Sequence, residues 1–276
     1  MQQIADDSLI TKKDNLLIVP SVQVEWTPES VLNTGIVAAY SSSILSLAIE
    51  RCVRNFECHS RGSHFSFRYP DDNCAALYPA LGEPVQNPQV IFINYLQHTA
   101  STNLVSSYLY TSAFAQQNGK PFMVFETNTA SCSGFPGISD SFGAALWALD
   151  WSLTMAYSNI TGALFHVGGQ NAYYNPFTPP PTNQSSFRQW TVGPVYYSAL
   201  VMAEAMGPSN ASQVVDLTTN TYAPIYGIYE NGSPTKVVLI NFVTDPSGAS
   251  TYNAVISIGG GTTGQNNATP AQVQVK

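Results

Sequence analysis

Charged residues are scarce in this sequence. Only 10% of the 276 residues are Asp, Glu, Lys or Arg, against about 25% in an average soluble domain. Ten Lys and Arg residues stand against 17 Asp and Glu, which gives a net charge of −7. Binding to nucleic acid or to an anionic membrane surface relies on clustered basic residues. We therefore expect neither nucleic acid nor a membrane among the partners of this protein.

Cysteine and long apolar runs are scarce as well. The four cysteines contain no CxxC pair and no zinc-binding spacing, so no metal site is predicted. Metal binding by Cys58 and His59 ranks below the other two interpretations of the segment 52–67, a foreign insertion and a functional loop. No apolar run reaches the ~18 residues of a membrane span. The opening stretch MQQIADDSLITKKDN lacks the apolar segment of a signal peptide.

Glycosylation triplets, by contrast, are frequent. Five Asn-x-Ser/Thr triplets occur, although Pro234 makes the one at Asn231 a poor acceptor. Together with the low charge they indicate an N-glycosylated, secreted protein. A secreted protein needs an entry signal, so we expect the natural chain to start upstream of Met1. The expected glycan acceptors are Asn159, Asn183, Asn210 and Asn267.

Apolar strands and helical patterns alternate along the first three quarters of the chain. Four strand–helix units favour a parallel sheet of the α/β class. Four units are half of an eight-fold barrel and leave unpaired sheet edges, so the fold is either a small open sheet or the second half of something longer. The predicted strands are 14–22, 44–50, 121–126 and 161–169; the predicted helices start at Pro28 (capped by Thr27), span 87–119, start from the cap Ser139, and span 193–207.

The pattern changes beyond residue 212. Alternating apolar segments flank Asn231-Gly232, a dipeptide typical of a β-hairpin turn. A further alternating segment covers 250–261. Residues 213–276 are therefore predicted to begin a β-sandwich domain that the chain does not complete.

Two polar residues at predicted strand ends are candidates for chemistry. Glu126 ends the apolar run PFMVFE, and catalytic groups of barrels gather at the carboxyl ends of strands; capping the next loop or pairing with an Arg would explain it equally well. His166 precedes the glycines at 168–169, whose amides could approach a ligand closely, and Tyr173 and Tyr174 could bind a sugar. The alternative for His166 is a hydrogen-bonded core histidine.

Two long segments carry a family resemblance. FETNTASCSGFPGISDSFGAALWALDWSLTMAYSN and GALFHVGGQNAYYNPFTPPPTNQSSFRQWTVGPVYYSALVMAEAMG are similar to fungal members of glycoside hydrolase family 79, the clan A family of β-glucuronidases and heparanases. The resemblance extends from LLIVPSV to the β-rich end. It implies that residues 1–212 form strands 5 to 8 of a (β/α)8 TIM barrel, with an incomplete β-sandwich after them. It also implies retaining hydrolysis of glucuronic or 4-O-methylglucuronic acid from a glycan.

The resemblance assigns one catalytic carboxylate and leaves out the other. The family's nucleophile ends the seventh barrel strand, which falls on Glu126. Its acid/base Glu follows an Asn after the fourth strand, and no Asn-Glu dipeptide occurs in this chain. Retaining hydrolysis needs two carboxyl groups about 5–5.5 Å apart, so we expect the chain as given to be inactive. The alternatives are a non-catalytic carbohydrate-binding remnant or pseudoenzyme, or a product that does not fold.

The resemblance also suggests the surroundings of the sugar. Ser131 stands where relatives carry Tyr or glycines around the glucuronate carboxylate, which leaves uronate specificity open. Cys74 and Cys132 each follow neighbouring barrel strands and are expected to form a disulfide. Carboxylates carry the chemistry, so no cofactor is expected. The expected substrate-binding residues are Tyr69, Ser131, His166, Gly168, Gly169, Gln170, Tyr173 and Tyr174.

One segment departs from the family pattern. Relatives resemble a continuous LAVERYPTDNC, whereas here residues 52–67 separate LAIER from RYPDDNC. We interpret 52–67 as a foreign insertion such as a retained intron; a genuine functional loop is the alternative. Sequencing of the transcript across this junction distinguishes the two.

Overall fold

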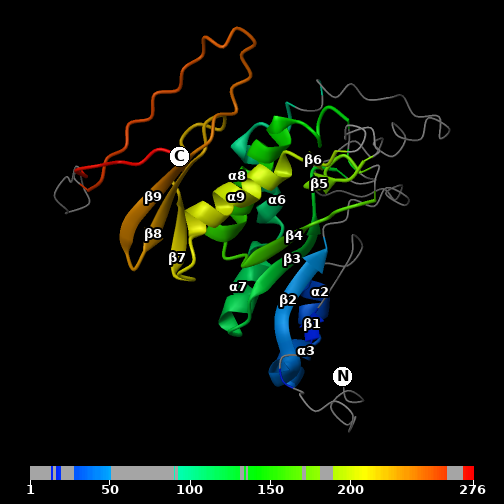
Figure 1. Cartoon of the computed structure of the whole chain (residues 1–276). Helices are drawn as coiled ribbons and strands as arrows, with labels where there is room; N and C mark the ends of the chain where they lie inside the picture. Colours follow the sequence, from blue (N-terminus) through cyan, green and yellow to red (C-terminus); the bar gives the residue numbers. More distant parts are fainter. Residues whose placement is uncertain are drawn as a thin grey trace.

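The chain folds into a parallel sheet, a helical layer and an antiparallel sheet (Figure 1). No helix in the described residues combines the length and the apolar character that crossing a bilayer requires. The computed structural model describes residues 14, 17–19, 28–50, 90, 93–130, 134, 136–169, 172–180, 189–259 and 270–276.

The parallel sheet has the strand order β1-β2-β3-β4, and all three pairings are parallel. The predicted α/β class and parallel sheet are therefore confirmed. β4 is shorter than predicted and ends at Phe165, although the backbone N–H of His166 still bonds the Thr127 carbonyl. Residues 15, 16 and 20–22 of the first predicted strand fall outside the described residues. The strands are β1 (Leu17–Val19), β2 (Ile44–Glu50), β3 (Phe122–Thr127) and β4 (Gly162–Phe165).

The helices differ from prediction at three places. The first predicted helix divides at Gly35, whose φ is +79°. Within residues 93–119, the described part of the helix predicted over 87–119, a turn at 93–97 is followed by two helices that a second turn separates at 107–108. The third predicted helix begins at Phe142, with Ser141 at the N-cap position but without a capping side-chain hydrogen bond, and the Ser139 hydroxyl accepts a hydrogen bond from Thr129. The predicted cap Gly207 is confirmed, with a φ of +63°. The helices are α2 (Pro28–Leu32), α3 (Ile36–Tyr40), α6 (His98–Ser106), α7 (Leu109–Gln117), α8 (Phe142–Tyr157) and α9 (Val195–Met206), with a 3-10 turn, η1, at Ser41–Ser43.

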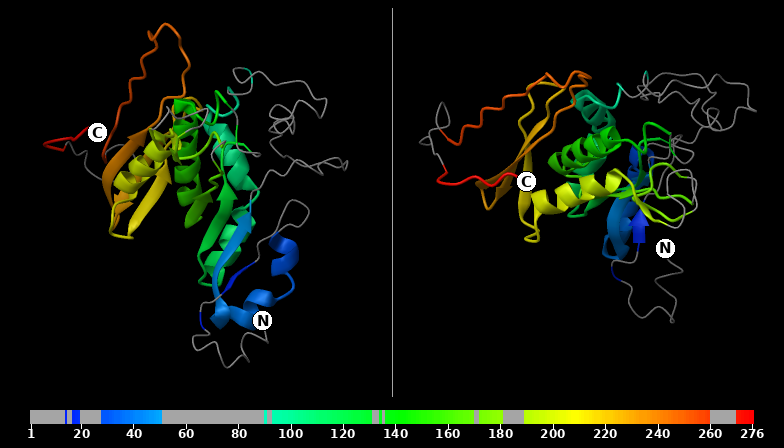
Figure 2. Two further views of the ribbon diagram at one scale, coloured as in Figure 1. Left: turned by 45° about the vertical axis from the view of Figure 1, so that its right-hand side comes forward. Right: turned by 45° about the horizontal axis from the view of Figure 1, so that its top comes forward.

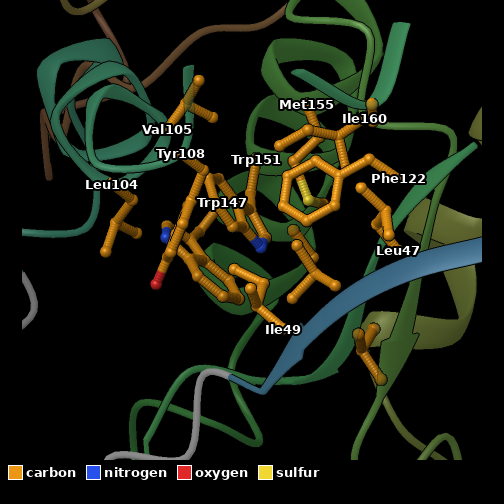
Figure 3. Packing of buried hydrophobic residues seen from close by; sticks show 14 of the residues in the cluster. Leu47, Ile49, Leu104, Val105, Tyr108, Phe122, Trp147, Trp151, Met155 and Ile160 are labelled. Carbon is orange, nitrogen blue, oxygen red and sulfur yellow. The ribbon is translucent and has the colours of Figure 1, made fainter. Parts of the chain in front are cut away.

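The main core lies between the parallel sheet and helices α6 to α8 (Figure 3). Trp147 and Trp151 of α8 are each 1% exposed and occupy its centre. Leu47 of β2 and Phe122 of β3 meet them from the sheet side. Such large apolar side chains contribute most of the burial energy of a layer. Packing of α8 against one face of the parallel sheet therefore holds the sheet in place.

The antiparallel sheet confirms the predicted hairpin. Asn231 and Gly232 have φ values of +52° and +77°, the backbone of a tight two-residue turn. The strand predicted within 250–261 is wrong for residues 250–257, which pair with no strand; Tyr252 and Ala254 on one side of this segment are half-buried, whereas Val255 on the other side is 96% exposed. The strands are β7 (Ser212–Asp216), β8 (Ile225–Glu230) and β9 (Ser233–Leu239), and a short pair absent from the prediction is β5 (Phe177–Thr178) with β6 (Thr191–Val192).

A second apolar core joins the antiparallel sheet to the helices. In Figures 1 and 2, α8 and α9 lie between β7–β9 and the parallel sheet. The same helical layer therefore packs against both sheets. The buried residues of this second core are Leu96, Leu149, Leu153, Ala205, Tyr226, Ile228, Ile240 and Phe242.

Candidate functional site

Glu126 lies at the carboxyl end of β3, one residue before the strand ends. Its side chain is 30% exposed. The next residue, Thr127, is buried, and its hydroxyl accepts a hydrogen bond of 3.2 Å from Trp151 Nε1. The end of the strand is thus fixed to the core while Glu126 remains open to solvent.

A local irregularity in β3 sets the direction of Glu126. Val124 pairs with Ile49 of β2, but the next pair is Glu126 with Glu50, so Phe125 is an extra residue. Such bulges bend a strand and re-aim the side chains beyond it. The register also brings the backbone of a second acidic residue, Glu50, opposite Glu126. The spacing of residues along the sequence gave no signal for the bulge.

His166 lies beside Glu126 and is held from several sides. Its Nε2 atom is 3.9 Å from Glu126 Oε1, and its Nδ1 atom is 2.7 Å from the Tyr174 hydroxyl. Its backbone N–H donates to the carbonyl of Thr127, and its carbonyl accepts from Asn128 Nδ2. The side chain is 44% exposed, so His166 is not a core histidine.

The loop after β4 is shaped by Asn175, which the sequence analysis did not single out. Its Oδ1 atom accepts a hydrogen bond of 2.9 Å from the Gly168 N–H, and its Nδ2 atom donates to the carbonyls of Gly168 and Gly169. Asn175 is 5% exposed. One buried amide therefore closes the loop that joins His166 to Tyr174. The only sequence signal was the Asn-Pro dipeptide, which is typical of turns.

The remaining predicted site residues divide into three groups. Tyr173 is half-buried, and Tyr174 is buried. Asn159 and Asn210 are exposed on turns with positive φ, where a glycan would have room. Predictions for Tyr69, Ser131, Gln170, Cys74, Cys132, Asn183, Asn267 and the segment 52–67 fall outside the described residues.

The chemistry available here is that of a carboxylate beside an imidazole. An oriented imidazole can donate a hydrogen bond to a carboxylate or exchange protons near it. Within the described ranges, no group of three or more His, Cys, Asp or Glu residues is arranged to hold a metal ion. The site thus combines an acid and an oriented histidine at the carboxyl end of the sheet, whereas the Gly168 N–H already donates to Asn175.

We expect Gly193→Ala to disrupt this loop. A methyl group at Gly193 would lie 1.9 Å from the Asn175 carbonyl oxygen, so the backbone around Asn175 must move. The expected loss of stability is about 1–3 kcal/mol, seen as a lower midpoint in urea unfolding. Gly169→Ala is the matched control, because a methyl there meets nothing within 4 Å. Equal losses for both variants would contradict the close packing of Gly193 on Asn175.

About half of the chain is similar in sequence to known beta-glucuronidases. No protein-family model matches the chain. It is 33% identical over 153 residues to a beta-glucuronidase of Aspergillus niger and 29% identical over 161 residues to one of Neurospora crassa. These alignments cover 54% and 53% of this chain but 28% of each relative. The chain therefore spans less than a third of the length of these curated relatives.

A solved structure resembles more of the chain. The crystal structure of a 4-O-alpha-L-rhamnosyl-beta-D-glucuronidase from Fusarium oxysporum, in complex with Rha-GlcA, superposes with a TM-score of 0.54 at 19% identity. The match covers 81% of this chain and 38% of that chain. At such low identity it shows a shared mixed α/β fold. The predicted resemblance to a glucuronidase-like family is confirmed over the half of the chain that the sequence alignments cover.

Proposed function

We propose that this chain is part of a secreted, retaining β-glucuronidase of glycoside hydrolase family 79, in which Glu126 is the nucleophile. The observation that carries the proposal is the position of Glu126, at the carboxyl end of a parallel strand and 3.9 Å from His166. The substrate would be a glycan with terminal glucuronic or 4-O-methylglucuronic acid. Glucuronidase relatives support this substrate class.

In this proposal the residues around Glu126 bind and orient the sugar. His166, held by Tyr174 at 2.7 Å, would contact the ring near the attacking carboxylate. The Gly168 and Gly169 backbone would shape the wall of the site, since Asn175 fixes it. Glu126 would attack the anomeric carbon as the glycosidic bond breaks and the acid/base protonates the leaving oxygen. The resulting glycosyl ester is then hydrolysed by water.

We further propose that β1 to β4 are strands 5 to 8 of an eight-stranded barrel, followed by a β-sandwich of which β7–β9 form the start. The edge strand β4 supports this, because Leu164 within it is 50% exposed and Val167, two residues after its end, is 57% exposed. A cavity of about 500 Å³ opens between β4, α8 and α9, lined by apolar residues that include Phe165 and Met202. Glu126 does not line this cavity, so we assign the cavity to packing of further barrel elements and not to the sugar.

The acid/base would then lie outside this chain. We expect no turnover of an aryl β-glucuronide by the chain alone, because one of two essential carboxyl groups is missing. Turnover is expected once the preceding part of the Aspergillus niger relative is joined upstream of residue 14. A control chimera without the acid/base Glu of that relative should stay inactive. Measurable hydrolysis by residues 1–276 alone would refute the missing-partner proposal and would direct attention to Glu50, which is in register with Glu126.

A further inference from the structure

A polar cluster lies where the helices meet the antiparallel sheet. His98 is the first residue of α6, Asp150 lies within α8, Asp216 ends β7, and Tyr226 belongs to β8. His98 and Asp150 are 7% and 0% exposed. None of the four residues belongs to the candidate site. Four elements far apart in the sequence therefore bring titratable groups together in the second core.

The histidine bridges two carboxylates. His98 Nδ1 is 3.0 Å from Asp150 Oδ1, and His98 Nε2 is 2.9 Å from Asp216 Oδ2. A neutral imidazole carries one N–H and could donate to only one of these oxygens. Both bonds form together only when the ring carries both protons. The geometry therefore selects the imidazolium form.

The surroundings make the cluster depend on that proton. The Tyr226 hydroxyl donates to Asp150 Oδ1 at 2.6 Å, and the Thr218 N–H donates to Asp216 Oδ1 at 2.9 Å. Asp150 Oδ2 is buried and meets no donor within the described part of the chain. The titratable groups that face His98 are Asp150 from α8, Asp216 from β7 and Tyr226 from β8. Two carboxylates and one imidazolium carry a net charge of −1. Without the extra ring proton this buried site would carry a charge of −2, which is more costly to bury.

The electrostatics agree with this geometry. Burial by itself would lower the pKa of His98, but the hydrogen bonds and charges of Asp150 and Asp216 outweigh it and raise the pKa to about 9. Burial likewise would raise the pKa of Asp216, but bonds from His98 and Thr218 bring it below its ordinary value. Burial and the nearby Asp150 raise the pKa of Tyr226, so this hydroxyl remains a donor.

We propose that His98, as an imidazolium bridging Asp150 and Asp216, is a protonation-dependent lock that fastens the antiparallel sheet to the helical layer. His98 and Asp150 belong to the helical side and Asp216 to the sheet side. Loss of the proton leaves one ring N–H between two carboxylates and sets a lone pair against the other, which weakens the bridge across this interface. The backbone N–H of His98 donates to the Thr221 carbonyl at 2.7 Å, and this bond connects α6 to the loop before β8. Apolar contacts of the second core then remain, without the charged bridge.

The direction in which stability depends on pH follows from the pKa shifts of His98 and Asp216. A raised pKa adds stability that is complete below the ordinary histidine value of about 6.5 and is lost as the pH rises through about 9. A lowered carboxyl pKa adds stability that is complete above the ordinary value of 3.8 and is lost as the pH falls through the folded-state pKa. The lock is therefore complete from about pH 4 to 6.5.

Hydrogen exchange measured by mass spectrometry on the whole chain tests the lock. At pH 6, after correction for intrinsic exchange rates, His98→Gln should reduce the protection of β7–β9 amides by at least about tenfold. Protection of β2 and β3 should stay unchanged. At pH 9.5, wild type and variant should agree. His166→Gln is the matched control, because His166 contacts neither Asp150 nor Asp216, and it should leave β7–β9 as in wild type.

Several outcomes would overturn the lock. They are equal protection of β7–β9 in wild type and His98→Gln at pH 6, a difference that persists at pH 9.5, or a loss spread equally over β2 and β3. If His98→Gln does not fold, the pH dependence of protection in the wild type tests the proposal by itself. The protection of β7–β9 relative to β3 should fall by at least about tenfold between pH 6 and pH 9.5, and a constant ratio would reject the proposal. Neither result depends on the proposed glucuronidase activity.

Discussion

Glu126→Gln is expected to abolish hydrolysis of an aryl β-glucuronide by a chain completed with the preceding barrel half. The amide cannot attack the anomeric carbon, so the glycosyl ester does not form. Removing a group that acts as part of a catalytic unit costs on the order of 10⁴- to 10⁶-fold in kcat. The fold should be unaffected, because the side chain is 30% exposed and Gln has nearly the same shape. Steady-state kinetics with thermal unfolding of the same samples measure both effects.

Glu50→Gln is the matched control for this experiment. Its backbone is in register with that of Glu126 on the neighbouring strand, but the proposal gives it no role in attack. A small anion supplies a second control, because azide can replace the missing carboxylate in Glu126→Ala and give a glycosyl azide of inverted configuration. If Glu50→Gln lost activity and azide rescued it instead, the assignment of the nucleophile would be wrong. Equal loss in both variants without rescue would point to two carboxylates from this chain.

Trp151→Ala is expected to have the largest effect on stability. Trp151 is 1% exposed at the centre of the main core, and truncation of a buried Trp costs about 3–5 kcal/mol. It also removes the 3.2 Å hydrogen bond to Thr127 Oγ1, next to Glu126. Urea unfolding followed by circular dichroism measures the loss. That loss is a large share of the 5–15 kcal/mol that typically separates folded from unfolded states.

A pair of milder variants isolates the hydrogen bond. Trp147 and Trp151 are equally buried in α8, but Trp147 Nε1 is a buried donor that meets no acceptor in the described structure. Replacement by Phe removes similar volume at both positions. Trp151→Phe should therefore cost about 1–3 kcal/mol more than Trp147→Phe, because it leaves Thr127 without its donor. A larger loss for Trp147→Phe would show that the bond to Thr127 does not hold the end of β3.

The folding pattern was largely readable from local sequence. Alternating apolar strands and helices predicted the parallel sheet, and Asn231-Gly232 predicted the hairpin. A helix boundary was wrong where a side chain has a tertiary partner: the Ser139 hydroxyl accepts a hydrogen bond from Thr129, and the helix begins only after Ser141. The alternation in 250–261 predicted a strand, but residues 250–257 find no pairing strand in the described chain.

What the sequence determined by itself is the class of fold, the family resemblance and the place of Glu126 at a strand end. These follow from periodicity and from short motifs, which depend on neighbours along the chain. Only the tertiary structure decided how Glu126 is aimed, because the bulge at Phe125 arises from pairing with β2. Only it brought His98 to Asp150 and Asp216, 52 and 118 residues away. Contacts at such separations are set by the packing of whole layers, which no local pattern encodes.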